Sequence, residues 1–375
     1  MTAGSWWRRL DRVQPIAALA LAVLGVMTIF SANADWRRQV VWIALGIAAY
    51  AVAASFDYRR LVGLAPALYI VMLLLLIAVH VVGRSALGAR RWLSLGGFPL
   101  EPSELSKLML VLVLAAFLSR RESLSWRRFA IILLLVAPPA ALIVTQPDLG
   151  TTIVFIAVFV GLLFVGGARP LHLASLGAVA VCALPLFPLV LHGYQLRRLR
   201  IFLNPSRDPL GAGYNLLQAR IAVGAGSFFG QGWLHGLQGQ LGFVPERATD
   251  FVFAIFAEQF GLLGSLVLLA VFGTLLVRVL KTAAVAPDRF GELVAAGVFV
   301  MIFVQVVENV GMNIGALPIA GIPLPLISYG GSATITTLAA LGLVQSVALR
   351  RRTVAYEPPG VVLASSRASR ARVSL

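Results

Sequence analysis

Long, uninterrupted stretches of apolar residues recur along this chain of 375 residues. Each stretch can form a helix that crosses a bilayer, which takes about 20 predominantly apolar residues. Within the stretches Leu, Val, Ala and Ile follow one another instead of alternating with polar residues, which favours helices over the strands of an outer-membrane barrel. The pattern predicts about ten transmembrane helices, over residues 15–31, 38–56, 61–82, 104–118, 129–144, 149–166, 171–193, 251–277, 290–310 and 332–349.

The spacing of these stretches predicts one polytopic membrane domain over residues 1–352. The seventh and eighth predicted helices are separated by a long loop, about residues 194–250. Residues 353–375 follow the last helix, and we expect them to form a disordered basic tail. The first stretch has no small-residue cleavage site after it and is followed at once by further stretches, so we expect it to be retained as a helix.

Composition supports a membrane protein. Hydrophobic residues make up 59% of the chain and charged residues 12%, with a mean hydropathy of +0.90, so a soluble core could not bury the apolar surface. The net charge of +16 comes from basic residues scattered among short loops, and we therefore expect no nucleic-acid partner. The single cysteine, Cys182, rules out an intramolecular disulfide or a cysteine-based metal site.

The distribution of basic residues predicts the orientation in the membrane. With a cytoplasmic N-terminus, sixteen Lys and Arg residues flank the inner helix ends and five lie in the short outer loops. Basic residues in short loops favour the cytoplasmic side. We therefore expect both termini in the cytoplasm and the 194–250 loop outside.

In this orientation three clusters of polar residues share the outer face. They contain Glu104 and Lys107, then Asp148, then Glu246, Thr249 and Asp250. An ionisable group at the edge of a span is costly and marks a candidate functional site. Helix capping or an interfacial lysine would also explain these residue types, and the pattern alone leaves both interpretations open.

Two outer segments carry further candidates. The glycine-rich residues 211–242 include Arg220, and can form a mobile loop, lie in the membrane interface or re-enter the membrane beside protein. Residues 317–331 are rich in proline and glycine without any charge, so we expect them to pack inside the protein. Three polar residues within predicted spans remain open between structural burial and cavity lining, namely Glu258, Glu308 and Asn309. The last two are also candidates for a partner site that faces lipid.

Four groups of motifs occur in the order and spacing of one known family. They are Arg91-Trp92-Leu93 with Pro102-Ser103-Glu104 and Lys107; Gln146-Pro147-Asp148-Leu149-Gly150-Thr151; Pro245-Glu246 with Thr249-Asp250-Phe251; and Gly321-Ile322-Pro323-Leu324-Pro325 with Ser328-Tyr329-Gly330-Gly331. The chain resembles the SEDS family, and within it the RodA branch of cell elongation and rod shape more than the FtsW division branch. The resemblance implies a glycosyltransferase that polymerises lipid II, the lipid-linked disaccharide pentapeptide, into peptidoglycan at the outer face of the bacterial cytoplasmic (inner) membrane.

The resemblance also implies site residues. Asp250 matches an essential aspartate of the family and is expected to act as the general base. Lys107 and Asp148 would line the same cavity. Departures from the family pattern are Glu101, where Gln is more common, and Gln259, where a second Glu is common. The remaining substrate-binding or cavity candidates are Glu104, Arg197, Arg198, Arg200, Arg220, Glu246 and Thr249.

For cofactors and partners, we expect no organic cofactor, and the resemblance allows a divalent cation, Mg²⁺ or Mn²⁺, with unknown ligands. It implies contacts with membrane lipids and with a class B penicillin-binding protein that crosslinks the glycan, and the 317–331 loop and the ninth predicted helix are the expected docking surface. Two other functions remain open: a flippase that moves lipid II across the membrane, and a non-catalytic scaffold for cell-wall enzymes. The absence of a Walker motif argues against an ATP-driven pump.

Overall fold

The structure is a computed structural model, and it describes residues 10–86, 89–95, 98–120, 124–146, 148–183, 198, 200–204, 208 and 211–351. Most of the chain is helical. The elements are α2 (Val13–Ser31), α3 (Trp36–Ser55), η1 (Tyr58–Arg60), α4 (Leu61–Val82), β1 (Arg84–Ala86), β2 (Ala89–Leu95), β3 (Phe98–Leu100), α5 (Pro102–Leu118), α6 (Trp126–Thr145), α7 (Leu149–Val165), α8 (Pro170–Ala183), α11 (Ala212–Ala225), α12 (Leu237–Gln240), α13 (Val252–Ala284), α14 (Arg289–Asn313) and α15 (Gly331–Leu349).

Each of the ten predicted transmembrane stretches coincides with a helix in the described residues. In the described part of the chain, seven helices are long and apolar enough to cross a membrane, and α7 and α8 are shorter apolar helices. The prediction of an all-α integral membrane protein is confirmed. Residues 184–193 at the end of the seventh predicted helix, parts of the 194–250 loop and the tail over residues 353–375 lie outside the described residues.

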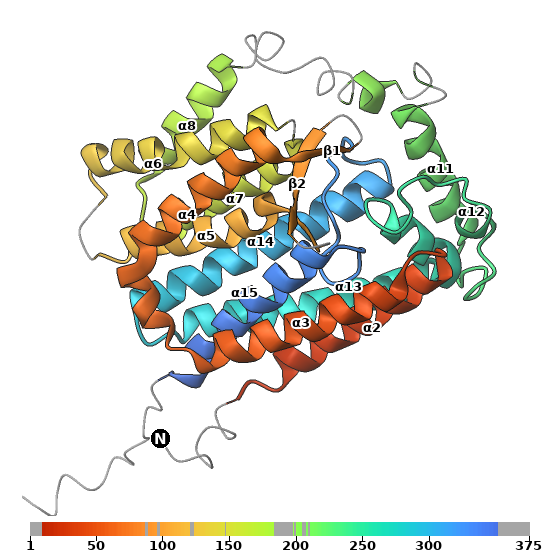
Figure 1. Cartoon of the computed structure of the whole chain (residues 1–375), viewed down its shortest axis with the longest axis horizontal. Coiled ribbons are helices and arrows are strands. Elements are labelled where there is room, and N and C mark those ends of the chain that lie inside the picture. Colours follow the sequence, from red (N-terminus) through yellow and green to blue (C-terminus); the bar gives the residue numbers. More distant parts are fainter. Residues whose placement is uncertain are drawn as a thin grey trace, which may run out of the picture.

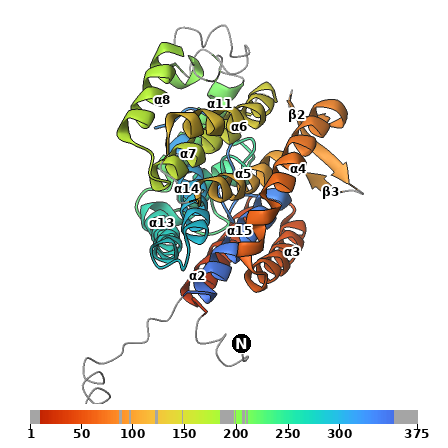
Figure 2. The same ribbon diagram turned by 90° about the vertical axis from the view of Figure 1, so that its left-hand side faces the viewer.

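The helices form one bundle in which the segments run side by side (Figure 1). Viewed along the bundle, α5, α14 and α15 lie inside, and α2, α3, α4, α6, α8 and α13 surround them (Figure 2). Nearly every residue of α5 is buried, the two charged residues of its N-terminal turns included. Large apolar side chains on the surrounding helices point outward, for example Val52, Val81 and Leu134, as expected where lipid is the solvent.

Small residues let helices α3 and α15 approach closely. A Cβ at Gly46 or Gly342 would overlap atoms of the facing helix, and a Cβ at Gly331 would lie 2.8 Å from Cδ2 of Trp42. Small residues at such interfaces allow close backbone packing in membrane proteins. This contact places the N-terminal end of α15 beside Trp42.

Helix α13 is interrupted at Gly261, whose φ of 65° and ψ of −165° are not helical. The backbone of a distant segment satisfies the groups freed by the break. Leu262 N–H donates to Ser227 O at 3.0 Å, and Gly232 N–H donates to Gln259 O at 3.0 Å. The interruption separates a buried half-helix, residues 252–260, from the long remainder of α13.

The break changes two sequence-based interpretations. Hydropathy predicts a continuous eighth helix over residues 251–277, but a helix terminus inside an apolar run leaves no mark on hydropathy. The interpretation of residues 211–242 as a mobile loop is also wrong, because they form α11 and α12 and hydrogen-bond to α13. Two glycines of this segment allow close backbone contact with α13, because a Cβ at Gly226 would overlap the carbonyl oxygen of Ala257 and one at Gly230 that of Gln259.

A small sheet lies between α4 and α5, and the sequence analysis missed it. Its strands are antiparallel in the order β1-β2-β3, with Leu93 opposite Leu100. The strands are short and carry no clear alternation, which explains why hydropathy did not reveal them. The sheet brings Trp92 and Pro99 to the edge of the site described next.

Candidate functional site

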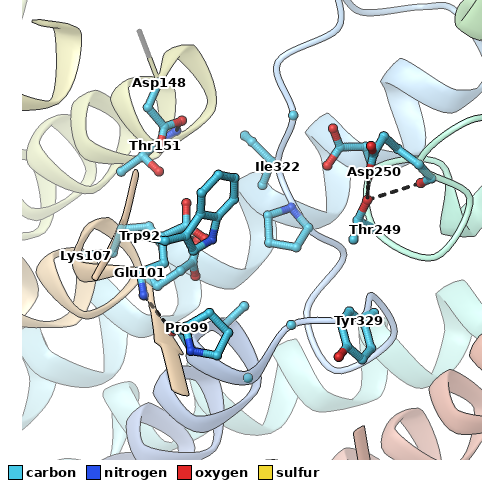
Figure 3. A pocket seen from close by; sticks show the side chains of 18 of the residues that line it. Trp92, Pro99, Glu101, Lys107, Asp148, Thr151, Thr249, Asp250, Ile322 and Tyr329 are labelled. Carbon is cyan, nitrogen blue, oxygen red and sulfur yellow. Dashed lines mark hydrogen bonds and ion pairs between the residues drawn. The ribbon is translucent and has the colours of Figure 1, made fainter. Parts of the chain in front are cut away.

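A cavity of about 310 Å³ lies at the end of the bundle where α5, α7, α13 and α15 begin. We call this the cavity end. Figure 3 shows Lys107, Glu101 and Trp92 on one wall and Thr249 and Asp250 on the other. The lining residues are Trp42, Trp92, Pro99, Glu101, Glu104, Lys107, Asp148, Thr151, Arg198, Glu246, Thr249, Asp250, Gly321, Ile322, Pro323, Tyr329, Gly330, Gly331, Ser332 and Ala333.

Lys107 and Glu104 form a buried ion pair on the first turns of α5. Lys107 Nζ lies 2.6 Å from Glu104 Oε1, and the side chains are 2% and 5% exposed. Lys107 therefore does not extend to an interface, as an ordinary lysine near a helix end would. Capping does not explain the pair either, because the N-cap position of α5 is Glu101, which makes no side-chain capping bond. A buried pair of this kind is expensive to desolvate.

Asp148 combines a structural and a cavity position. Its Oδ1 accepts a hydrogen bond from the Thr151 N–H at 3.1 Å and caps α7. Its side chain is buried and also lines the cavity. The capping interpretation of Asp148 is therefore confirmed, and the cavity contact comes in addition to it.

Asp250 lies just before the half-helix, and its backbone is fixed from α14. Asn309 Nδ2 and Asn313 Nδ2 each donate to the Asp250 carbonyl oxygen at 3.0 Å. The N-cap position of α13 belongs to Phe251. The carboxylate of Asp250 lines the cavity.

The Asp250 carboxylate and the Arg198 guanidinium meet above Gly321. Asp250 Oδ2 lies 3.3 Å and an Arg198 terminal nitrogen 3.4 Å from the position that a Cβ would take at Gly321. Gly321 has a φ of +75°, which a residue with a side chain rarely adopts. Arg198 is anchored in turn to the 317–331 loop, because it donates to Ile319 O at 3.1 Å. An acid and a cation thus share one wall of the cavity.

The uncharged 317–331 loop packs inside the protein, as expected. Leu324 and Ile327 are fully buried. Ser328 Oγ donates to Thr249 O at 2.6 Å, and the Tyr329 N–H donates to Ala248 O at 2.7 Å. The loop therefore holds the backbone of Ala248 and Thr249, the two residues before Asp250.

Glu246 and Thr249 also lie at the cavity. Thr249 Oγ1 donates to Glu246 Oε2 at 3.1 Å. Glu246 has a φ of 51°, in the left-handed region, and its side chain is exposed. The turn between them thus presents a carboxylate at the opening next to Asp250.

The remaining predicted arginines differ from one another. Arg220 Nη2 donates to Gly315 O at 2.8 Å, and its side chain is not among those that line the cavity. Arg200 is helical and exposed, and it does not line the cavity. Arg197 lies outside the described residues. Of the predicted arginines within the described part of the chain, the cavity contains Arg198.

Several lining residues escaped the sequence analysis as site candidates. Trp42 lies within an apolar run, where nothing distinguishes a cavity residue from a lipid-facing one. Trp92, Thr151 and Tyr329 belong to the motifs that carry the family resemblance, and that is the signal that would have found them. The same holds for Gly321, Ile322, Pro323, Gly330 and Gly331. The other residues missed are Pro99, Ser332 and Ala333.

Glu258 on α13, a candidate for either structural burial or cavity lining, has a structural role. Glu258 is buried and accepts hydrogen bonds from the N–H groups of Gln238, at 2.7 Å, and Gly239, at 3.0 Å. Gln259 Nε2 donates to Ser31 Oγ at 2.8 Å. These residues connect the half-helix to α12 and α2 and are not part of the cavity lining.

Among the described residues, no group of three or more His, Cys, Asp or Glu side chains is arranged to hold a metal ion. Five carboxylates line the cavity, among them those of Glu246 and Asp250. Mg²⁺ is often bound by one or two carboxylates together with substrate phosphates. Carboxylates of the cavity have the chemistry to supply such ligands, and the described residues provide no complete protein cage.

A second, apolar cavity of about 280 Å³ adjoins the first. It shares Trp42, Pro99, Gly331 and Ser332 with the polar cavity, and Leu100, Leu105 and Ile335 complete much of its wall. The site therefore presents charged and apolar surfaces side by side, as an amphiphilic ligand requires.

The apolar bundle and its two adjoining cavities define a multi-pass membrane protein with a polar, acid-rich site next to an apolar one at the cavity end. The model of the FtsW/RodA/SpoVE family, described as cell cycle proteins, matches residues 15–353. The chain belongs to this family.

Similar proteins include curated and solved members. The chain is 41% identical over 352 residues to the peptidoglycan glycosyltransferase MrdB of Escherichia coli strain K12, and the match covers 92% of this chain and 94% of that protein. It is 35% identical to the stage V sporulation protein E of Bacillus subtilis strain 168, over 90% of this chain and 96% of that protein.

Two solved structures resemble the fold along nearly its whole length. A chain from a peptidoglycan synthase complex, studied for the coordination of polymerization and crosslinking, is 36% identical with a TM-score of 0.79, and the match covers 90% of this chain and 97% of the other. The rod shape determining protein RodA of Thermus thermophilus is 33% identical with a TM-score of 0.70, over 92% and 98%.

Proposed function

We propose that this protein is a peptidoglycan glycosyltransferase of cell elongation that polymerises lipid II, with Asp250 as the general base. The observation that carries the proposal is that Asp250 and the buried cation Lys107 lie opposite each other in the same cavity (Figure 3). The names of its relatives, among them MrdB and RodA, support the same activity. The adjoining apolar cavity suits a lipid-linked sugar.

The reaction needs one base and one stabilised leaving group. The sugar of lipid II is α-linked to pyrophosphate and the polymer is β-linked, so a single inverting displacement suffices. The 4-hydroxyl oxygen of the acceptor forms the bond to the anomeric carbon, the bond from that carbon to the pyrophosphate oxygen breaks, and the hydroxyl proton passes to the Asp250 carboxylate. General-base assistance of this kind contributes typically about 10² to 10⁴ in rate.

Cations on the cavity wall would stabilise the departing pyrophosphate. Lys107 and Arg198 line the cavity from opposite sides, and oriented cations are effective where charge develops in a site shielded from water. A divalent cation, held by Glu246 together with the substrate phosphates, would neutralise further charge on the phosphates. Arg200 and Arg220 would then act outside the immediate site.

The proposed location is the bacterial inner membrane, with both termini cytoplasmic and the cavity outside. The domain proposal is one membrane domain over residues 1–352 and a basic tail over residues 353–375. The basic residues of the short loops support this orientation. Leu241 lies in the proposed outer loop and is 63% exposed. In a Cys182→Ala background, Leu241→Cys should react with an impermeant thiol reagent on intact cells, and reaction after permeabilisation alone would reverse the orientation.

The proposed partner is a class B penicillin-binding protein. A related chain is part of a complex that coordinates polymerization and crosslinking. The 317–331 loop is unsuited as a docking surface because its apolar residues are buried. On α14, Phe303 and Val307 are each 46% exposed and remain candidates. Changing both to Ala should reduce co-purification from detergent, and unchanged recovery of the complex would exclude this face.

The decisive experiment measures glycan polymer formed by purified protein from lipid II. Asp250→Asn, nearly isosteric with the parent, should keep lipid II binding and lose about 10² to 10⁴ in rate, because an amide cannot accept the proton. A folded Asp250→Asn protein that polymerises within a few-fold of the parent would disprove the base assignment. Lipid II transport without polymerisation by the parent would favour the flippase instead.

A further inference from the structure

One face of α14 carries three buried amides at four-residue intervals. Gln305, Asn309 and Asn313 are 3%, 0% and 0% exposed. Residues four apart lie above one another on a helix, and eight residues of rise separate the outer two by about 12 Å. The three side chains therefore form a row along the helix axis, and we call this row the polar ladder.

The C-terminal part of the polar ladder, Asn309 and Asn313, holds the backbone around Asp250. Asn309 and Asn313 both donate to the Asp250 carbonyl oxygen. Asn313 Oδ1 also accepts from the Ala254 N–H in the half-helix at 3.0 Å, and Asn309 Nδ2 donates to Ile322 O at 2.7 Å. Two amides thus fix the Asp250 carbonyl, the half-helix and the 317–331 loop relative to α14.

The N-terminal end of the polar ladder, Gln305, contacts Lys107 on the opposite wall of the cavity. With its amide oxygen turned toward α5, Gln305 accepts from Lys107 Nζ at 2.8 Å and donates to Met301 O at 3.3 Å. Lys107 is then held by both Glu104 and Gln305. This amide orientation satisfies both groups of Gln305, which the reverse orientation does not.

We propose that the polar ladder is a positioning device that sets the separation of Asp250 and Lys107 across the cavity. The inference rests on the proposed function of Asp250 as the base. A helix is rigid on this length scale, and each amide of the polar ladder connects it to one of the two groups. Misplacing a reacting group by about 1 Å can cost about 10²-fold in rate, so a fixed spacing has direct kinetic value.

The two ends of the polar ladder should give different kinetic signatures. Asn309→Ala and Asn313→Ala should lower kcat by about tenfold or more with KM near the parent value, because the base is misplaced while substrate still binds. Gln305→Leu should instead raise KM, since a less well held Lys107 weakens contact with the substrate. Higher lipid II should restore the rate of the Gln305 variant and not the rates of the Asn variants.

A double-variant cycle separates positioning from a merely structural role. If Asn313 acts through Asp250, adding Asn313→Ala to Asp250→Asn should reduce the residual rate by less than about twofold. Multiplication of the two separate losses would overturn the inference. The matched control is Gln345→Leu on α15, a fully buried amide without a hydrogen-bond partner among the described residues, and its rate and KM should equal those of the parent.

Folding and function are distinguished by two further measurements. Where Asn313→Ala lowers the recovery of folded protein, Asn313→Ser is to be assayed, and a parental kcat in either folded variant would overturn the positioning role. If Asp250→Asn itself polymerises at the parental rate, the proposed function fails. If Asp250→Asn is inactive while Asn309→Ala and Asn313→Ala have parental kcat, the polar ladder alone is disproved.

Discussion

At the end of the bundle opposite the cavity, acidic side chains pair with arginines from other segments. Asp11 before α2 lies 2.9 Å from Arg278 Nε on α13. Asp288 at the start of α14 lies 2.9 Å from Arg59 Nε and accepts from Tyr58 Oη at 2.5 Å. Each of these acids connects two elements, and much of each arginine side chain remains in contact with solvent.

At the cavity end the same residue types are arranged around an open space. Lys107 and Glu104 are paired on one helix and are almost fully buried, while Asp148, Glu246 and Asp250 line the cavity. Burying both partners of a pair costs more desolvation free energy than burying one partner, as in the pair of Asp11 with the partly exposed Arg278. At the opposite end, ion pairs connect neighbouring elements. At the cavity end, charged groups are kept at an energetic cost, where the proposed chemistry needs them.

The largest expected effect concerns the buried pair of the cavity end. Lys107→Ala leaves Glu104 buried without its cation, which should lower the free energy of unfolding by about 3–5 kcal/mol and reduce polymerisation. Part of the lost rate should return at higher lipid II. Thermal unfolding in detergent and polymer assays measure the two effects.

A double variant serves as the control. Lys107→Met with Glu104→Gln removes both charges and should recover most of the stability, since no unpaired charge remains. Polymerisation should stay low. Recovery of the parental rate would mean that Lys107 serves the fold alone.

The second prediction concerns the close contact above Gly321. Gly321→Ala should lower polymerisation by about tenfold or more, because its Cβ would press on Asp250 and Arg198. The positive φ adds about 1–2 kcal/mol of strain. The matched control is Gly167→Ala, with a φ of +86° and no atom within 4 Å of its Cβ position. It should lose similar stability and keep its activity, and equal losses of activity would contradict the contact argument.

A smaller effect is expected at Asp288, at the opposite end. Burial raises the pKa of this carboxyl, but hydrogen bonds from Tyr58, the Gly291 N–H and Arg59 outweigh burial and hold the pKa below its ordinary value. A lowered folded-state pKa stabilises the protein above the ordinary pKa, and this stabilisation is lost as the pH falls through the folded-state value. Asp288→Asn should therefore lower the Tm at pH 7, with activity per folded molecule unchanged.

The pH dependence provides the check for Asp288. The Tm difference between parent and Asp288→Asn should shrink as the pH falls from 7 to below about 3.9, the ordinary aspartate pKa. A Tm difference that is the same at every pH would show that the ionised carboxylate does not cause the stabilisation.

The smallest effect is expected for Asp57, whose Oδ1 lies 3.5 Å from Arg350 Nε in a partly exposed pair. Exposed pairs contribute about 0–1 kcal/mol, so Asp57→Asn should change the Tm by a few degrees at most and leave polymerisation at the parental rate. If Asp57→Asn lowered the free energy of unfolding as much as Lys107→Ala does, the contrast between the two ends would be wrong.

Hydropathy alone determined where the ten transmembrane segments lie, because a bilayer demands about 20 apolar residues for each span. The same reasoning placed Lys107, Asp148 and Asp250 on one face, and the structure brings all three to one cavity. Ionisable groups at the edges of apolar runs are rare enough to be seen in a single sequence. Their chemical roles remain predictions.

Tertiary structure decided what those residues contact. The break at Gly261 depends on backbone groups from residues 227–232, and Asp250 is fixed by amides on α14, 59 and 63 residues further along the chain. Arg220 looked like a cavity cation and instead bonds to Gly315. Hydropathy and local propensity report a residue's own neighbourhood in the sequence, whereas these contacts exist because packing brings distant segments within hydrogen-bonding range.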